Sequence, residues 1–166
     1  MSLKNKRKSG LGFTLLELII VITIIALLAA ATFVAVDPAK RIGQANNAQR
    51  WSDVTAILNA ILTYVVDNSG TYPGSGWTNN QLYVLGTTSE GCDVTSLCTA
   101  TNTAQASCLN LASDLIPTFL ATIPQDPLLN GNSASHTDYY IYQTTGGRVT
   151  VGACERYNNE KIEVSR

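Results

Sequence analysis

The feature that most constrains this chain is an apolar run near its N-terminus that contains a single charge. Residues 18–36 include no charged side chain, and Glu17 is the only charge between Gly12 and Val36. A bilayer hydrocarbon core of about 30 Å requires about 20 apolar residues in a helix. The run is therefore long enough to cross a membrane.

Charges on either side of the run predict its orientation. Four basic residues precede it, namely Lys4, Lys6, Arg7 and Lys8. The positive-inside rule then places the N-terminus in the cytoplasm and everything after Val36 outside. A charge at the centre of such a helix costs about 2.5 to 3.5 kcal/mol, so an acidic residue within it suggests a function and a cationic partner. We therefore expect a single-pass protein of the cytoplasmic membrane in which Glu17 has a specific role.

The order of these residues resembles a known signal. A basic leader, Gly12, Phe13, the sequence Thr-Leu-Leu, Glu17 and a long apolar helix look like the class III signal of type IV prepilins and pseudopilins. The resemblance implies that a prepilin peptidase cuts between Gly12 and Phe13 and that Phe13 is N-methylated. It also implies that Glu17 acts in filament assembly by neutralising the Phe13 ammonium of a neighbouring subunit.

Two simpler interpretations compete with this one. An ordinary secretory signal also has a basic segment and an apolar segment, and Ala29-Ala30-Ala31 resembles its cleavage site. However, the apolar run exceeds the usual 7 to 15 residues and includes Glu17. A plain uncleaved anchor explains the length and the basic residues, but it leaves the Gly-Phe-Thr-Leu-Leu-Glu sequence unexplained.

Beyond Val36, the chain is expected to continue as the second half of one long helix. A kink or local melting is expected at Pro38, because proline removes a backbone hydrogen bond and clashes with the preceding turn. An apolar stripe at spacings of three and four residues then predicts an amphipathic helix, which should end at Asn68-Ser69-Gly70. The stripe consists of Trp51, Val54, Ile57, Leu58, Ile61, Leu62 and Val65.

The C-terminal part carries the clearest strand pattern. Residues 139–144 and 148–153 are β-rich runs on either side of Gly146-Gly147, which predicts a hairpin. Short strands are also expected at 82–85 and 162–164. One or two short helices are expected within 109–120, with Ser113 and Asp114 as caps and Pro117 in a first turn.

These elements predict an α+β, pilin-like fold in which the long N-terminal helix packs on a small C-terminal antiparallel sheet. Four regions follow: a leader at 1–12, a transmembrane and filament-core helix at 13–36, its amphipathic half at 37–68, and a globular head at 69–166. The head of about 100 residues can bury only a modest core, so additional cross-links would stabilise it.

Four cysteines lie in the part predicted to be outside: Cys92, Cys98, Cys108 and Cys154. An even number in an oxidising compartment favours two disulfides, and three pairings are open. We prefer Cys92 with Cys98 and Cys108 with Cys154, since the first closes a small loop and the second ties the middle of the head to its C-terminal strands. A zinc site is disfavoured, because CxxC pairs are absent and His136 is remote in sequence.

Charged residues suggest few other sites. Arg41 and Arg50 are candidates for salt bridges between subunits. We expect each more simply to be a solvated surface charge, because exposed pairs contribute only about 0 to 1 kcal/mol. Asp126, Asn130, Asn132 and Asp138 form a weak candidate calcium site without EF-hand spacing. Apart from that candidate, no cofactor is expected.

We expect no enzymatic activity, because the sequence contains neither a Walker-type phosphate loop nor a GxSxG motif. His136 stands alone in a polar loop, which is more typical of a surface residue than of a catalytic base. Cleavage after Gly12 would remove four of the 11 basic residues, leaving seven against 12 acidic ones and a net charge of −5. An acidic surface argues against broad binding to nucleic acid.

The leading hypothesis is a structural subunit of a type IV pilus (fimbrium) or a related filament. The resemblance implies a homo-oligomeric helical filament at the cell surface, assembled from the membrane by an ATPase and platform machinery and serving adhesion or motility. One alternative is a pseudopilin of type II secretion or of a competence system that takes up DNA. Another is a membrane-anchored monomeric adhesin or binding module.

Overall fold

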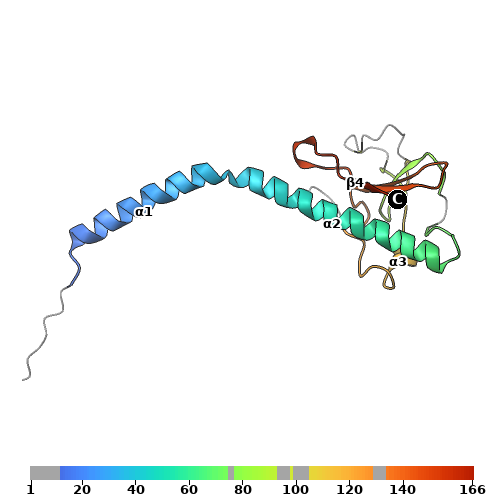
Figure 1. Cartoon of the computed structure of the whole chain (residues 1–166), viewed down its shortest axis with the longest axis horizontal. Coiled ribbons are helices and arrows are strands. Elements are labelled where there is room, and N and C mark those ends of the chain that lie inside the picture. Colours follow the sequence, from blue (N-terminus) through green and yellow to red (C-terminus); the bar gives the residue numbers. More distant parts are fainter. Residues whose placement is uncertain (1–11, 75–76, 93–97, 99–104, 129–133) are drawn as a thin grey trace, which may run out of the picture. The chain divides into compact units, whose positions relative to one another are not determined.

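The structure is a computed structural model that describes residues 12–74, 77–92, 98, 105–128 and 134–166 (Figure 1). Its elements are α1 (Leu15–Val36), α2 (Pro38–Asp67), β1 (Leu82–Val84), α3 (Ala112–Leu115), β2 (Tyr139–Gln143), β3 (Val149–Ala153), the 3-10 turn η1 (Tyr157–Asn159) and β4 (Glu163–Ser165). The predicted α+β fold is confirmed. The chain divides into two compact units, Met1–Arg41 and Ile42–Arg166.

Helix α1 is the main element of the first unit. Leucine, isoleucine and alanine favour a helix here, and the hydroxyl groups of Thr23 and Thr32 donate to the carbonyls of Ile20 and Ala29 at 2.8 and 2.9 Å. These threonines therefore satisfy their polar groups within the helix. In the described part of the chain, α1 is the one helix long and apolar enough to cross a membrane, with a mean hydropathy of 3.0.

The long helix is interrupted where the sequence predicts a disturbance. Asp37 adopts a left-handed conformation with φ 44°, and Pro38 is the first residue of α2. A proline is well tolerated there, because its missing N–H would have no partner within the helix. The Asp37 side chain accepts from the Lys40 N–H at 3.3 Å, so it caps the new helix. The interruption is a capped break at Asp37 and not a kink inside one helix.

The predicted apolar stripe of α2 is confirmed as the helical side of the head core. Val54, Ile57, Leu58 and Ile61 are completely buried, and the other stripe residues are partly buried. The helix ends at Asp67. Gly70, with φ 91°, donates its N–H to the carbonyl of Val65 at 2.8 Å, which closes the last turn as the sequence predicts.

Four antiparallel strands form one sheet in the order β1-β2-β3-β4. The predicted hairpin is β2 and β3, in which Ile141 lies opposite Val151. Alternate residues of a strand point to opposite faces. One face therefore packs against α2 (Figure 1). Its buried strand residues are Tyr83, Tyr139, Ile141, Val149, Val151 and Ala153.

The other face of the sheet is also covered. Leu82, Val84 and Tyr140 form a second buried cluster with three cysteines, Cys92, Cys98 and Cys154. The disulfide-linked segments thus supply the second layer over a sheet whose first layer is α2. This explains why consecutive residues of β1 are all buried, which is unusual for a sheet with one face in water.

Two details between the strands differ from the prediction. The helical region within 109–120 contains only the four-residue α3, and neither Ser113 nor Asp114 caps it. Instead, the Asn110 side chain accepts from the Ala112 N–H at 2.9 Å, and Asp114 accepts from the Gly74 N–H. Pro117 follows the helix in a cis peptide bond and does not lie in a first turn.

Candidate functional site

The predicted processing and assembly residues lie together at the start of α1. Gly12 and Phe13 precede the helix, and Phe13 is 90% exposed. The backbone of Thr14 is extended, with φ −78° and ψ 152°, and the helix begins at the next residue. The Gly12–Phe13 peptide bond therefore lies in non-helical, accessible chain, as a peptidase substrate requires.

Glu17 has a local partner that the sequence analysis missed. Its carboxylate accepts from the backbone N–H and from the hydroxyl group of Thr14, both at 2.9 Å, while the Thr14 hydroxyl accepts from the Glu17 N–H at 3.2 Å. This reciprocal arrangement is a capping box, which satisfies N–H groups that a helix start leaves unpaired. The sequence pattern Thr-x-x-Glu before an apolar run predicts such a capping box.

The surface of α1 is apolar on all sides. The helix has no buried residue, and its large exposed side chains range from 43% exposed at Ile19 to 82% at Val34. A helix that is apolar all round is stable in a membrane or inside an assembly, not in water. This surface therefore requires an environment that the single chain does not provide.

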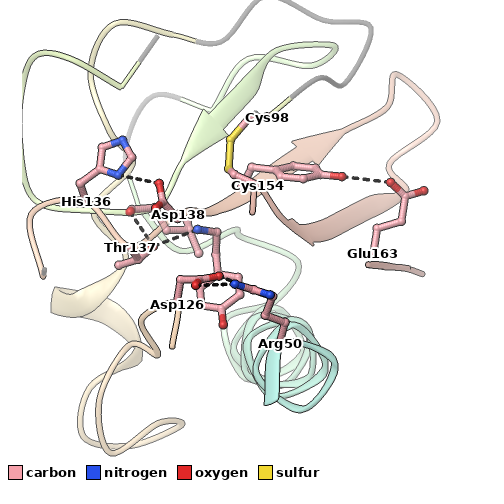
Figure 2. The surroundings of a disulfide bond; sticks show 11 residues. Arg50, Cys98, Asp126, His136, Thr137, Asp138, Cys154 and Glu163 are labelled. Carbon is pink, nitrogen blue, oxygen red and sulfur yellow. Dashed lines mark hydrogen bonds and ion pairs between the residues drawn. A yellow bond between two sulfur atoms is a disulfide. The ribbon is translucent and has the colours of Figure 1, made fainter. Parts of the chain in front are cut away.

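Arg50 does not lie on the surface, contrary to both predictions for it. Its side chain is completely buried and binds both carboxylate oxygens of Asp126 at 2.5 and 2.8 Å (Figure 2). Burial by itself would lower the pKa of Arg50, but the hydrogen bonds and the charge of Asp126 raise it above its ordinary value. Arg50 therefore joins α2 to the head within one chain, whereas Arg41 is exposed as expected.

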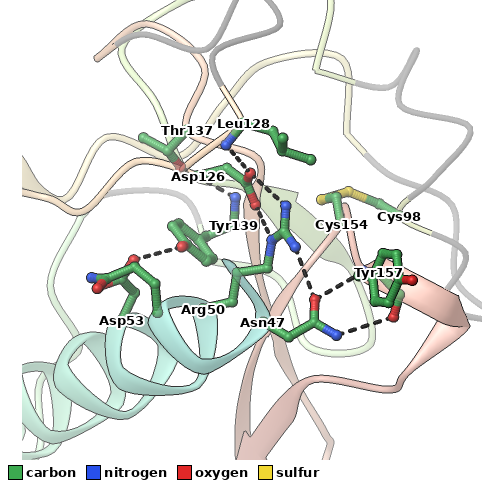
Figure 3. Close-up of polar contacts among 11 residues, drawn as sticks. Asn47, Arg50, Asp53, Cys98, Asp126, Leu128, Thr137, Tyr139, Cys154 and Tyr157 are labelled. Atoms are coloured by element: carbon green, nitrogen blue, oxygen red, sulfur yellow. Dashed lines mark hydrogen bonds and ion pairs between the residues drawn. A yellow bond between two sulfur atoms is a disulfide. The ribbon is translucent and has the colours of Figure 1, made fainter. Parts of the chain in front are cut away.

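The Arg50 pair belongs to a larger polar network between α2 and the head (Figure 3). Asn47 accepts from Arg50 at 2.9 Å and from the Tyr157 N–H at 2.9 Å, and it donates to the Tyr157 carbonyl at 3.0 Å. Further along α2, Asp53 accepts from the Tyr139 hydroxyl at 2.7 Å. Burial and this hydrogen bond raise the pKa of Tyr139. The network fixes the register of the head along the helix.

The four cysteines form two disulfides, but the predicted pairing is wrong. Cys92 is bonded to Cys108. Cys98 is bonded to Cys154, as Figure 2 shows. The prediction paired Cys92 with Cys98 to close a small loop and Cys108 with Cys154 to tie the middle of the head to its C-terminal strands. The tertiary fold decides otherwise, because the Cys92 N–H donates to the Ala106 carbonyl at 3.0 Å and the Cys108 N–H donates to the Thr88 carbonyl at 3.1 Å, which places Cys92 beside Cys108.

The residues of the candidate calcium site have other roles or lie outside the described residues. Asp126 is bound by Arg50 and also accepts from the Leu128 N–H at 2.9 Å. Asp138 pairs with His136 at 3.0 Å (Figure 2). Asn130 and Asn132 lie outside the described part of the chain. Calcium binding stays a hypothesis. The pairing of Asp126 with Arg50 argues against that carboxylate as a calcium ligand.

A comparison with known families agrees with the N-terminal geometry. Residues 7–33 match the family model described as the prokaryotic N-terminal methylation motif. No curated protein and no solved structure matches the chain. The matched segment includes Gly12, Phe13 and Glu17, while the head lies outside it.

The matched motif indicates a class of protein, and the fold is consistent with it. The chain carries the class III signal of type IV pilins and pseudopilins, and that signal is followed by long helices and a small antiparallel sheet. The match supports a type IV pilin-like or pseudopilin precursor, and the apolar N-terminal helix fits anchoring in a membrane.

Proposed function

We propose that the protein is a structural subunit of a type IV pilus or a related extracellular filament. In this role the chain waits in the cytoplasmic membrane, loses residues 1–12 to a prepilin peptidase and is methylated at Phe13. It then leaves the membrane and joins a helical filament at the cell surface. The chain is a substrate of processing enzymes and not itself an enzyme.

The observation that carries this proposal is the exposed apolar helix behind the methylation motif. A membrane can cover α1, and so can a bundle of identical helices, and subunits that move from one to the other keep the helix out of water throughout. An ordinary anchor would require only the first environment and no processing motif. The match at residues 7–33 therefore favours a helix that is covered first by the membrane and later by the helices of neighbouring subunits.

Glu17 supports the same proposal through its charge. Its capping box with Thr14 satisfies hydrogen-bonding groups, but it leaves a negative charge at the end of an apolar helix. A charge buried without a partner of opposite sign costs several kcal/mol. In a filament, the ammonium group that cleavage creates on Phe13 of a neighbour would neutralise it and set the axial register.

Two substitutions at Glu17 separate the capping role from the charge. Glu17→Gln retains a side chain that fits a capping box but removes the charge, whereas Glu17→Ala removes both. Both variants should be processed and remain in the membrane, and both should be absent or strongly depleted in sheared surface fibres. Immunoblots of membrane and sheared fractions measure this.

Equal incorporation of Glu17→Gln and the wild-type chain would contradict the role of the charge. If the wild-type chain were itself never found in sheared fibres, the filament proposal would fail, and a membrane-anchored adhesin or binding module would become the better explanation. A short filament confined to the cell envelope would instead indicate a pseudopilin of a secretion or competence system.

A further inference from the structure

His136, remote in sequence from the cysteines, lies beside one of the two disulfides. The sulfur atoms of Cys92 and Cys108 and a ring nitrogen of His136 all lie within 4.8 Å of one another. Cys92 is buried, and Cys108 is half-buried. The three side chains come from three separate segments of the head.

Backbone hydrogen bonds hold these segments together independently of the sulfur–sulfur bond. The Cys92 N–H donates to the Ala106 carbonyl at 3.0 Å, and the Cys108 N–H donates to the Thr88 carbonyl at 3.1 Å. The N–H groups of Thr87 and Thr88 both donate to the Ser135 carbonyl, next to His136, at 3.2 Å. The three side chains therefore remain neighbours when the disulfide is reduced.

Two thiolates and an imidazole are a donor set that zinc prefers. Zinc binds cysteine sulfur at about 2.3 Å and histidine nitrogen at about 2.0 to 2.1 Å, and three protein ligands leave a fourth position for water. Asp138 lies 3.0 Å from Nδ1 of His136 (Figure 2). A carboxylate paired with an imidazole is a common way to orient a histidine that binds zinc.

We propose that the reduced head binds one zinc ion through Cys92, Cys108 and His136, and that zinc and the Cys92–Cys108 disulfide exclude each other. Binding of Zn²⁺ displaces one proton from each thiol. Oxidation by the disulfide of a thiol oxidoreductase transfers two electrons from the two thiolates to that disulfide. The products are the Cys92–Cys108 bond, free Zn²⁺ and the reduced dithiol of the oxidoreductase, which takes up two protons from water.

This site would also influence which disulfides form. Four cysteines permit three pairings, and a zinc ion would hold Cys92 and Cys108 side by side. Oxidation of the zinc-bound head would then give the observed pairs, Cys92 with Cys108 and Cys98 with Cys154. The inference does not depend on the proposed filament function, since it concerns the head alone.

The test uses the full-length chain in detergent, reduced with a phosphine under anaerobic conditions and titrated with Co²⁺ and then Zn²⁺. Tetrahedral cobalt bound to thiolates gives intense near-ultraviolet charge-transfer absorption that zinc abolishes. We expect one equivalent to bind to the reduced wild-type chain and to the Cys98→Ser/Cys154→Ser variant. The oxidised chain and the reduced Cys92→Ser/Cys108→Ser variant should not show the band.

His136→Ala should weaken metal binding by on the order of 10-fold or more, because it removes a direct ligand. If reduction unfolds the head, one equivalent of zinc should restore the circular dichroism of the folded chain in the wild type but not in His136→Ala. The proposal is overturned by a folded, reduced wild-type chain without the cobalt band. It is also overturned if His136→Ala binds as tightly as the wild type, or if the oxidised chain binds equally well.

Discussion

Helix α1 and the head differ in how their apolar side chains are kept from water. Helix α1 makes its hydrogen bonds along itself and has no buried residue. The head covers both faces of its sheet, one with α2 and the other with segments joined by two disulfides. The head therefore contains its own stabilising contacts, whereas α1 depends on a membrane or on other subunits to cover it.

The two regions also treat charge differently. Between α2 and the head, the completely buried Arg50 has a fixed carboxylate partner, Asp126. At the start of α1, Glu17 has only hydrogen bonds to Thr14, and no cationic side chain pairs with it among the described residues. The unit of α2 and the head pairs its buried charge internally, whereas under the proposed function the charge of Glu17 is neutralised by a neighbouring subunit on assembly.

The largest effect is expected from breaking the buried pair of the head. Arg50→Ala leaves Asp126 as an uncompensated buried charge, which should destabilise the head by about 3 to 5 kcal/mol. Denaturant unfolding of the full chain in detergent, followed by tryptophan fluorescence, reports on the unit Ile42–Arg166, which contains the head and most of α2, because both tryptophans, Trp51 and Trp77, lie in it. Arg41→Ala, at an exposed arginine, is the matched control and should change the stability little. Equal effects of the two variants would contradict the assignment.

Removing the disulfides should give the next effects, in an order set by the length of chain that each one closes. The Cys98–Cys154 pair is separated by 56 residues and the Cys92–Cys108 pair by 16. Loop-closure entropy predicts losses of about 4 and about 3 kcal/mol for the respective double serine variants. The same fluorescence measurement applies. Peptide mapping of the unreduced chain would contradict the pairing if it recovered Cys92 linked to Cys98.

Two isoleucine substitutions compare the regions directly. Ile57 in α2 is completely buried, whereas Ile24 in α1 is 51% exposed. Ile57→Ala should cost about 2 to 5 kcal/mol, because it removes buried methyl groups and leaves a cavity. Ile24→Ala should leave the unfolding of the head unchanged and should act only on membrane retention or fibre yield. A comparable loss of head stability in both variants would show that the regions are not independent.

The smallest effect concerns Glu155. Partial burial and the carboxylates of Asp126 and Asp138 raise its pKa above the ordinary value. A raised pKa means that Glu155 favours the folded state while protonated, at low pH, and that this contribution is lost as the pH rises through the folded-state pKa. Glu155→Gln should therefore increase the stability of the head at neutral pH by up to about 0.5 kcal/mol, a typical limit for surface changes. The difference should shrink at acidic pH, and a variant that is less stable at neutral pH would contradict the assignment.

Local patterns were sufficient to predict most of the fold. The α2 stripe, the hairpin and the N-terminal signal follow from spacing within short segments, and β2 and β3 lie within the residues predicted for them. The capping box of Thr14 and Glu17 is equally local, because its pattern, Thr-x-x-Glu before an apolar run, is present in the sequence.

Contacts between distant segments were not predictable in the same way. Arg50 takes a polar position on its helix in the sequence, and only the tertiary fold brings Asp126, 76 residues away, into contact with it. The disulfide pairing and the position of His136 beside Cys92 and Cys108 likewise depend on how the loops cross the sheet. One sequence contains no local signal for any of these three contacts.

The central claim is that the N-terminal helix is both a processed signal and an assembly surface. Mass spectrometry of the mature chain tests it most directly, because the position and methylation of the N-terminus distinguish all the interpretations. The account predicts an N-terminus at Phe13 that carries one N-methyl group, in both membrane and fibre fractions. An N-terminus near Thr32 would indicate an ordinary secretory signal, and an intact leader would indicate a plain anchor. Either result would contradict the account.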